Sequence, residues 1–222
     1  MTKNSFTEEN YLKAIYKLSE KIDNEGVSTN DIAAELSTKA ASVTDMLKKL
    51  SDKKLINYKK YQGVSLTSKG AKVAIDIIRK HRLWELFLVD KLEFKWDEVH
   101  DIAEQLEHID SDDLIDKLDS FLGFPKYDPH GDPIPNKSGV FANKKMLELF
   151  ELPVGFKGNI SGVSDHSAVF LKHLEKIGIT LGVQIKIEDK NLFDNSFWIS
   201  VAEAEPIFVS KEVAKNLLVF KK

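Results

Sequence analysis

The feature that most restricts the fold of this chain is a stretch of residues 99–108 that carries four metal-competent side chains. At about 100° per residue, His100, Glu104, Glu107 and His108 fall within roughly a 100° arc of one helix. Imidazole nitrogens and carboxylate oxygens suit a borderline to hard divalent transition ion. The stretch therefore predicts an ion bound on one face of a helix, although an exposed acidic helix with two incidental histidines has the same composition.

The composition limits the kind of ion and the class of protein. The chain has 222 residues, of which 42 % are hydrophobic, and it contains no cysteine. This length suits one large domain or two to three small ones, and the missing cysteines exclude disulfides, iron–sulfur clusters and cysteine-bound zinc. The N-terminal residues lack the apolar segment of a secretion signal, and no run approaches the roughly 18 apolar residues of a membrane span. A cytoplasmic protein is therefore expected.

The formal net charge of −3 is unevenly distributed along the chain. Residues 1–80 carry 15 Lys and Arg against 10 Asp and Glu, while residues 81–142 carry 6 against 15. Residues 143–222 are nearly balanced, with 11 against 10. A basic first third favours a polyanionic partner, and an acidic middle third favours cation binding.

The first third, residues 1–72, is predicted to be a winged helix-turn-helix domain. A capping-box sequence at Ser5 precedes a helix over about 7–21. Two helices over about 28–36 and 40–52 follow with a short connection, which is the helix-turn-helix pattern. Alternating residues over 55–67 indicate a hairpin, the wing.

The outward face of the helix over about 40–52 and the wing are basic, which favours DNA binding. A small helical unit with a hairpin can also serve as a protein-interaction module, where such lysines are merely solvated. The residues predicted to contact DNA are Lys39, Ser42, Thr44, Asp45, Lys48, Lys59 and Lys60.

The middle third, residues 73–142, is predicted to be a helical domain that dimerises and binds metal. A long helix over about 70–89 places His81 and Glu85 one turn apart, where they could share an ion. A helix near Asp97 and another over 112–121 follow, and their surplus apolar faces favour a two-fold interface that would suit a palindromic DNA site.

Residues 143–152 are predicted to be a linker with a short helix over 144–150, and residues 153–222 a small β-rich domain. The expected elements are strands over 158–163, 183–187 and 197–201 and a helix over 167–177, followed by a closing strand and helical turn, which together suit a partly open barrel. His130 and His173 are expected to be structural or solvated.

Taken together, these motifs resemble the diphtheria toxin repressor family of iron- and manganese-dependent regulators, and the resemblance covers the whole chain. The segments that carry it are 10–16 (NYLKAIY), 43–44 (VT), 66–70 (LTSKG), 79–85 (RKHRLWE), 99–100 (VH), 107–108 (EH) and 129–135 (PHGDPIP). The resemblance implies a mainly α protein with three parts: a winged helix, a helical dimerisation domain and a small C-terminal SH3-like (FeoA-like) barrel.

The resemblance also implies two metal sites. The primary, activating site matches Asn10, Glu104, Glu107 and His108, and the ancillary site matches His81, Glu85 and His100, with Asp165 and His166 as further candidates. The chain departs from the iron regulators, which have Met and Cys where it has Asn10 and Glu104. The additional first-helix Glu of the short manganese regulators falls on Lys13.

The implied function is that of a homodimeric, metal-activated transcriptional repressor that senses Mn²⁺ or Fe²⁺ and controls metal-uptake genes through a palindromic operator, with the N and O donors favouring Mn²⁺. An iron-specific regulator is the near alternative. A metallohydrolase that uses the His/Glu cluster around a bound water is the alternative from another class. A third possibility is a DNA-binding regulator in which the cluster is only structural.

Overall fold

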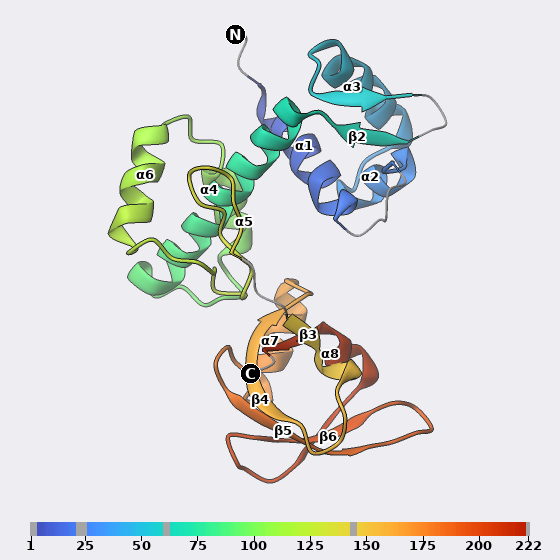
Figure 1. Ribbon diagram of the computed structural model, residues 1–222, viewed down its shortest axis with the longest axis vertical. Helices are drawn as coiled ribbons and strands as arrows, with labels where there is room; N and C mark the ends of the chain where they lie inside the picture. The colour runs from blue at the N-terminus through green and yellow to red at the C-terminus, as the bar shows by residue number, and fades with distance from the viewer. Residues whose placement is uncertain (1–3, 21–25, 60–62, 143–145, 221–222) are drawn as a thin grey trace. The chain divides into compact units, whose positions relative to one another are not determined.

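The computed structural model describes residues 4–20, 26–59, 63–142 and 146–220 (Figure 1). The chain divides into two compact units. The first comprises residues 1–81, 106–112 and 135–140, and the second comprises residues 82–105, 113–134 and 141–222. The fold is mainly helical with a small C-terminal sheet, as the sequence predicted. None of the described helices is long and apolar enough to cross a membrane.

The first unit contains the predicted winged helix-turn-helix. Its helices are α1 (Phe6–Ser19), α2 (Thr29–Glu35) and α3 (Ala40–Asp52), and its hairpin pairs β1 (Ile56–Tyr58) with β2 (Val64–Leu66). The apolar stripes of the three helices and the hairpin meet in one core, whose largest side chains include Leu12, Ile15, Ile32, Leu47 and Leu50. Helix α3 therefore turns its lysine-bearing side outward.

The N-terminus of α1 is fixed to α3 by one buried carboxylate. Ser5 accepts a hydrogen bond from the backbone of Glu8, and the Glu8 side chain accepts from the backbone of Ser5, which completes the predicted capping box. Lys49 of α3 and Lys53, the residue that caps the C-terminus of α3, lie 3.1 and 2.7 Å from Glu8 Oε1. Burial opposes the charge on Glu8, but hydrogen bonds from Lys53, Ser5 and Lys49 outweigh it and lower the pKa of Glu8 to about 2.

The wing leads directly into the long helix α4 (Ser68–Leu92) through a close backbone contact. The Thr67 hydroxyl donates to the Leu55 carbonyl and accepts from the Gly70 backbone. A Cβ at Gly70 would overlap the Leu55 carbonyl oxygen, so only glycine allows α4 to start this close to the hairpin.

The helical part of the second unit comprises the end of α4 and nearly all of the helices α5 (His100–Leu106) and α6 (Asp112–Phe121). Leu83, Ile115, Leu118 and Ile134 form its core. The helix predicted to begin near Asp97 and to include His108 is shorter than expected. It begins at His100 and ends at Leu106, whose carbonyl accepts from Ile109, so Glu107 and His108 lie in the turn that follows.

The C-terminal part of the second unit is a six-stranded antiparallel sheet in the order β3-β8-β4-β5-β6-β7. Its elements are β3 (Met146–Glu148), η1 (Leu149–Glu151), β4 (Lys157–Val163), α7 (Ala168–Lys176), β5 (Gln184–Lys190), β6 (Phe197–Val201), β7 (Ile207–Val209), α8 (Lys211–Asn216) and β8 (Leu217–Phe220). The predicted strands and the helix α7 are confirmed.

The helix predicted over 144–150 is wrong at residues 146–148, while residues 149–150 lie in the short 3-10 helix η1. Residues 146–148 form a strand because Met146 pairs with Phe220 and Glu148 pairs with Leu218 of β8. The sheet thus already begins within the segment predicted as a linker. Beyond that strand the sheet is curved, with register shifts in the β4–β8 and β5–β6 pairings.

Candidate metal centre

The first candidate site lies in the first unit, where α1 meets the turn after α5. His108 stacks on the Phe6 ring, with the ring centroids 4.6 Å apart, and its Nδ1 lies 2.7 Å from Glu9 Oε2. Its Nε2 lies 3.9 Å from Glu107 Oε1. A carboxylate that accepts a hydrogen bond from Nδ1–H favours the tautomer in which Nε2 carries a lone pair, which is the arrangement of metal-binding histidines.

Two buried oxygens at this site have no hydrogen-bond partner among the residues that the structure describes. They are Oε1 of Glu107, whose residue is fully buried, and Oδ1 of Asn10, on α1. A buried polar atom is nearly always satisfied, and an unsatisfied buried carboxylate oxygen is especially unfavourable. The donor set of Asn10, Glu107 and His108 therefore fits a divalent ion that accepts oxygen and imidazole ligands.

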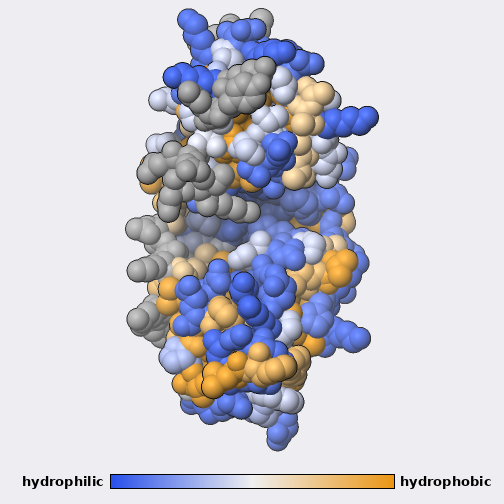
Figure 2. Space-filling model, turned by 90° about the vertical axis from the view of Figure 1, so that its right-hand side faces the viewer, coloured by the Kyte–Doolittle hydropathy of each residue, from blue (hydrophilic) through white to orange (hydrophobic). Residues whose placement is uncertain are grey.

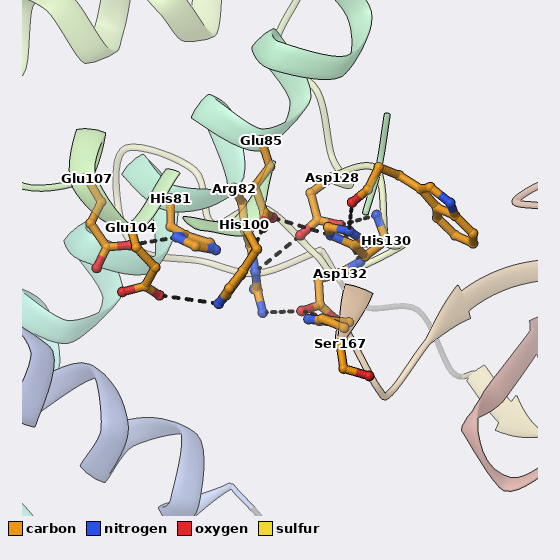
Figure 3. Close-up of polar contacts among 12 residues, drawn as sticks. His81, Arg82, Glu85, His100, Glu104, Glu107, Asp128, His130, Asp132 and Ser167 are labelled. Atoms are coloured by element: carbon orange, nitrogen blue, oxygen red, sulfur yellow. Dashed lines mark hydrogen bonds and ion pairs between the residues drawn. The ribbon is translucent and has the colours of Figure 1, made fainter. Parts of the chain in front are cut away.

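The other oxygen of Glu107 is fully engaged. Oε2 accepts from Lys13 Nζ at 2.6 Å. It also lies 2.6 Å from His81 Nδ1 (Figure 3). His81, which the family resemblance assigns to the ancillary site, is thus in direct contact with a residue of the primary site.

The second candidate site lies wholly within the second unit and is formed by Glu85, Asp128 and His130. One ligand atom from each lies within 4.8 Å of the others, and all three residues are buried (Figure 3). Burial, together with the charges of Asp132 and Glu85, raises the pKa of Asp128 to about 7. Burial opposes protonation of His130, but hydrogen bonding and charge from Glu85 outweigh it and raise its pKa to about 9. Without an ion, protons neutralise this cluster, and a divalent ion would displace them.

The orientation of His130 suits a metal ligand. Its Nε2 lies 2.8 Å from the carbonyl oxygen of Trp96, so Nε2–H donates there. Its Nδ1 is buried and faces Glu85 Oε2 at 3.5 Å. A backbone carbonyl that fixes the tautomer in this way is a typical outer partner of a metal-binding histidine.

The loop that carries Asp128 and His130 is held by its own hydrogen bonds and by Arg82. Asp128 Oδ1 accepts from the backbone of His130 and of Asp132. Arg82 of α4 donates to Asp132 at 2.9 Å and to the Pro133 carbonyl at 2.5 Å. Gly131 has φ +90°, and a Cβ there would overlap the Ser161 carbonyl oxygen of β4. The loop is therefore anchored between α4 and the sheet.

The other predicted ancillary residues surround this second site. His100 Nδ1 lies 3.4 Å from Glu85 Oε1, and its Nε2 lies 3.7 Å from Glu104, which the resemblance assigns to the primary site. The His166 ring stacks on His130 at 4.8 Å, and burial lowers the pKa of His166. Asp165 accepts from the backbone of Ser167 and shapes the turn before α7.

Asp128 and His130 are the site residues that sequence reasoning missed. His130 was expected to be structural or solvated, and Asp128 was not considered, although His173 does lie exposed on α7 as expected. The available signal was the sequence Asp-Pro-His-Gly-Asp over 128–132, in which three ionisable side chains surround a proline and a glycine.

The predicted DNA-contacting residues lie on the outer side of the winged helix. Lys39, Ser42, Asp45, Lys48 and Lys59 are exposed, Thr44 is half-buried, and Lys60 lies outside the described residues. Asp45 pairs with Lys48 at 3.1 Å, which reduces its repulsion of a phosphate. Figure 2 shows hydrophilic side chains interspersed with hydrophobic ones over one face of the molecule.

Three family models match the chain in series. Residues 5–64 match the N-terminal DNA-binding domain of iron-dependent repressors, and residues 67–136 match their metal-binding and dimerisation domain. Residues 147–221 match the FeoA domain. This succession defines the class as three-domain, metal-dependent DNA-binding repressors.

Individual relatives agree with this class. The iron-dependent repressor IdeR of Mycobacterium leprae is 35 % identical over 158 residues, which is 67 % of this chain and 67 % of that protein. The diphtheria toxin repressor of Corynebacterium glutamicum is 27 % identical over 193 residues, covering 82 % of this chain and 83 % of its own.

Solved structures are similar over nearly the whole chain. A manganese-dependent transcriptional repressor in complex with manganese has a TM-score of 0.87 and 31 % identity, covering 97 % of this chain and all of that one. The manganese regulator SloR has a TM-score of 0.77 and 34 % identity, with both chains fully covered.

The chain therefore belongs to the diphtheria toxin repressor family of iron-dependent repressors. It is a DNA-binding transcriptional repressor, not an enzyme, and its metal is Fe²⁺ or Mn²⁺. Its partners are DNA and a second copy of the chain.

Proposed function

We propose that this repressor is activated by Mn²⁺ in preference to Fe²⁺, through a primary site that comprises Asn10, Glu107 and His108. The observation that supports the site most directly is the unpartnered, buried Oε1 of Glu107 beside His108 Nε2. Glu104 is a further proposed ligand of this ion, and Glu85, Asp128 and His130 are proposed to hold a second one.

Manganese follows from the kind of donor available. The chain contains no cysteine, so neither site can include a thiolate, the donor that favours softer ions. Mn²⁺ stands lowest in the general affinity order of divalent ions, so its sensor depends on hard oxygen ligands and geometry. Carboxylate, amide and imidazole groups meet that requirement. Fe²⁺ remains the competitor, because it accepts the same donors.

The proposed mechanism is a shift in the population of conformations. An ion between Asn10 on α1 and the turn at Glu107 would hold α1 in one position, and the Glu8–Lys49 contact connects α1 to the recognition helix α3. Such an ion stabilises whichever arrangement brings its ligands together, and that is how metal can raise DNA affinity. In a dimer, both recognition helices would be fixed at once, which suits a palindromic operator.

We propose that the targets of this repressor are metal-uptake genes and that the repressor acts in the cytoplasm.

A titration of DNA binding against free metal tests this function. Metal-free protein, prepared with a chelator and mixed anaerobically with fluorescent operator DNA, should bind weakly and gain affinity with Mn²⁺. Fe²⁺ should need a higher free concentration than Mn²⁺ for half-maximal activation. Zn²⁺ should raise DNA affinity less than Mn²⁺ when the two ions occupy the same fraction of the metal sites. Chelator-insensitive DNA binding would contradict the proposal and would favour a cluster that is only structural.

The wing supplies a separate prediction about DNA. Lys59 is exposed at the end of β1 and is proposed to contact a phosphate. Lys59→Ala should weaken binding to all sequences alike and reduce the slope of log affinity against log salt by about one. Lys117→Ala is the matched control, because Lys117 is exposed on α6 and pairs with Asp113. An unchanged salt slope for Lys59→Ala would remove the wing from the DNA interface.

A further inference from the structure

Lys13 is a buried lysine on α1 whose ammonium group lies among the side chains of the first unit's metal site. The residue is 4 % exposed. Its Nζ lies 2.6 Å from Glu107 Oε2 and 3.2 Å from His81 Nδ1. The His81 and Glu107 atoms lie 2.6 Å from each other, so the three groups form one closed triangle.

The two oxygens of the Glu107 carboxylate therefore have different surroundings. Oε2 already has a cation beside it, while Oε1 has no hydrogen-bond partner and lies near His108 Nε2. In two-metal sites, cations about 3.5–4 Å apart are held together by shared ligands, and a carboxylate can supply one oxygen to each. Here the position at Oε2, which also has an imidazole nitrogen beside it, contains an ammonium group.

We propose that Lys13 is a tethered cation that occupies the position of a second metal ion at Glu107, so that the primary site accepts only one ion. The inference rests on the proposed function in taking Glu107 and His108 as ligands. A protonated lysine has no lone pair and cannot ligate an ion. Its fixed charge instead repels a second divalent ion at Oε2 and compensates the buried Glu107 carboxylate when no metal is bound.

Lys13 would thus have two separable effects. In the metal-free protein it stabilises the folded site, because removing one partner of a buried ion pair leaves an uncompensated charge. In the metal-bound protein it sets the number of ions, because Oε2 of Glu107 and Nδ1 of His81 could otherwise bind one more.

The test is to count Mn²⁺ ions per subunit and to measure thermal unfolding of full-length Lys13→Met. Calorimetry should find one more ion than in the parent, and the electron paramagnetic resonance spectrum should show a spin-coupled Mn²⁺ pair that the parent lacks. The unfolding midpoint of the metal-free variant should fall by roughly 6 °C or more. Mn²⁺ should raise that midpoint by more than it raises the parent's.

Lys13→Arg keeps the charge and should bind as many ions as the parent. Lys53→Met is the matched control, because it removes the same charge from the same unit. Lys53 contacts Glu8 and not Glu107. It should bind no additional ion, and Mn²⁺ should not reverse its loss of stability. Lys13→Gln, which removes the charge but retains a hydrogen-bond donor, repeats the count if Lys13→Met does not fold.

Two outcomes separate this inference from the function on which it rests. If His108→Ala binds as many ions as the parent, the proposed primary site is wrong, and the inference falls with it. If His108→Ala loses an ion but the uncharged Lys13 variants keep the parent's ion count and metal-free stability, the inference on Lys13 alone is overturned.

Discussion

His108→Ala should abolish the metal-dependent part of DNA binding while leaving the weak, metal-free binding unchanged. His108 supplies the only imidazole that we assign to the primary ion, and Glu9 and Phe6 hold its ring in place. Altering an outer partner of a metal ligand typically weakens metal binding 10–100-fold, so loss of the ligand itself should exceed about 100-fold. The measurement is operator affinity against free Mn²⁺, followed by fluorescence anisotropy.

Two further variants make this result specific. Glu9→Gln leaves the imidazole in place but removes the carboxylate at its Nδ1, so the response to Mn²⁺ should weaken by roughly 10–100-fold without disappearing. His173→Ala removes an exposed histidine on α7 and should respond as the parent does. If His108→Ala were activated by Mn²⁺ at the parent's concentration, the primary site would have to lie elsewhere.

The parts of the fold that the sequence predicted best are those determined by local interactions. The capping box at Ser5, the helix pair α2–α3 and the hairpin are each specified by neighbouring residues, and all are confirmed. Strand β3 was mistaken for a helix because its structure depends on β8, some 70 residues later in the chain. Pairing over that distance leaves no local period.

The residues of the candidate sites also differ in whether local sequence spacing could predict them. Helical spacing pointed to Glu107 and His108, although α5 ends one residue before them. The same spacing gave no sign that Lys13 and His81 would reach Glu107, because those contacts join α1, α4 and the turn after α5. Asp128 and His130 lie in a loop without periodicity, and their approach to Glu85 depends on tertiary anchors such as Arg82.

The second site should bind an ion independently of the first. Asp128→Asn removes the charge of one proposed ligand, and its amide oxygen can still accept from the backbone of His130 and Asp132. The variant should therefore fold and bind one Mn²⁺ fewer per subunit than the parent. DNA binding should still respond to Mn²⁺, at a higher concentration, because the primary site is intact.

His130→Ala should give the same ion count, since it removes the nitrogen that faces Glu85. His166→Ala distinguishes a ligand from a neighbour, because His166 stacks on His130 but its Nε2 lies 3.2 Å from the Val163 carbonyl oxygen. If His166 only packs there, its variant keeps the ion.

Combining Asp128→Asn with His108→Ala should remove both ions. If Asp128→Asn alone abolished both the ion count and the DNA response, the two sites would be one coupled centre, and their separate assignment would be wrong.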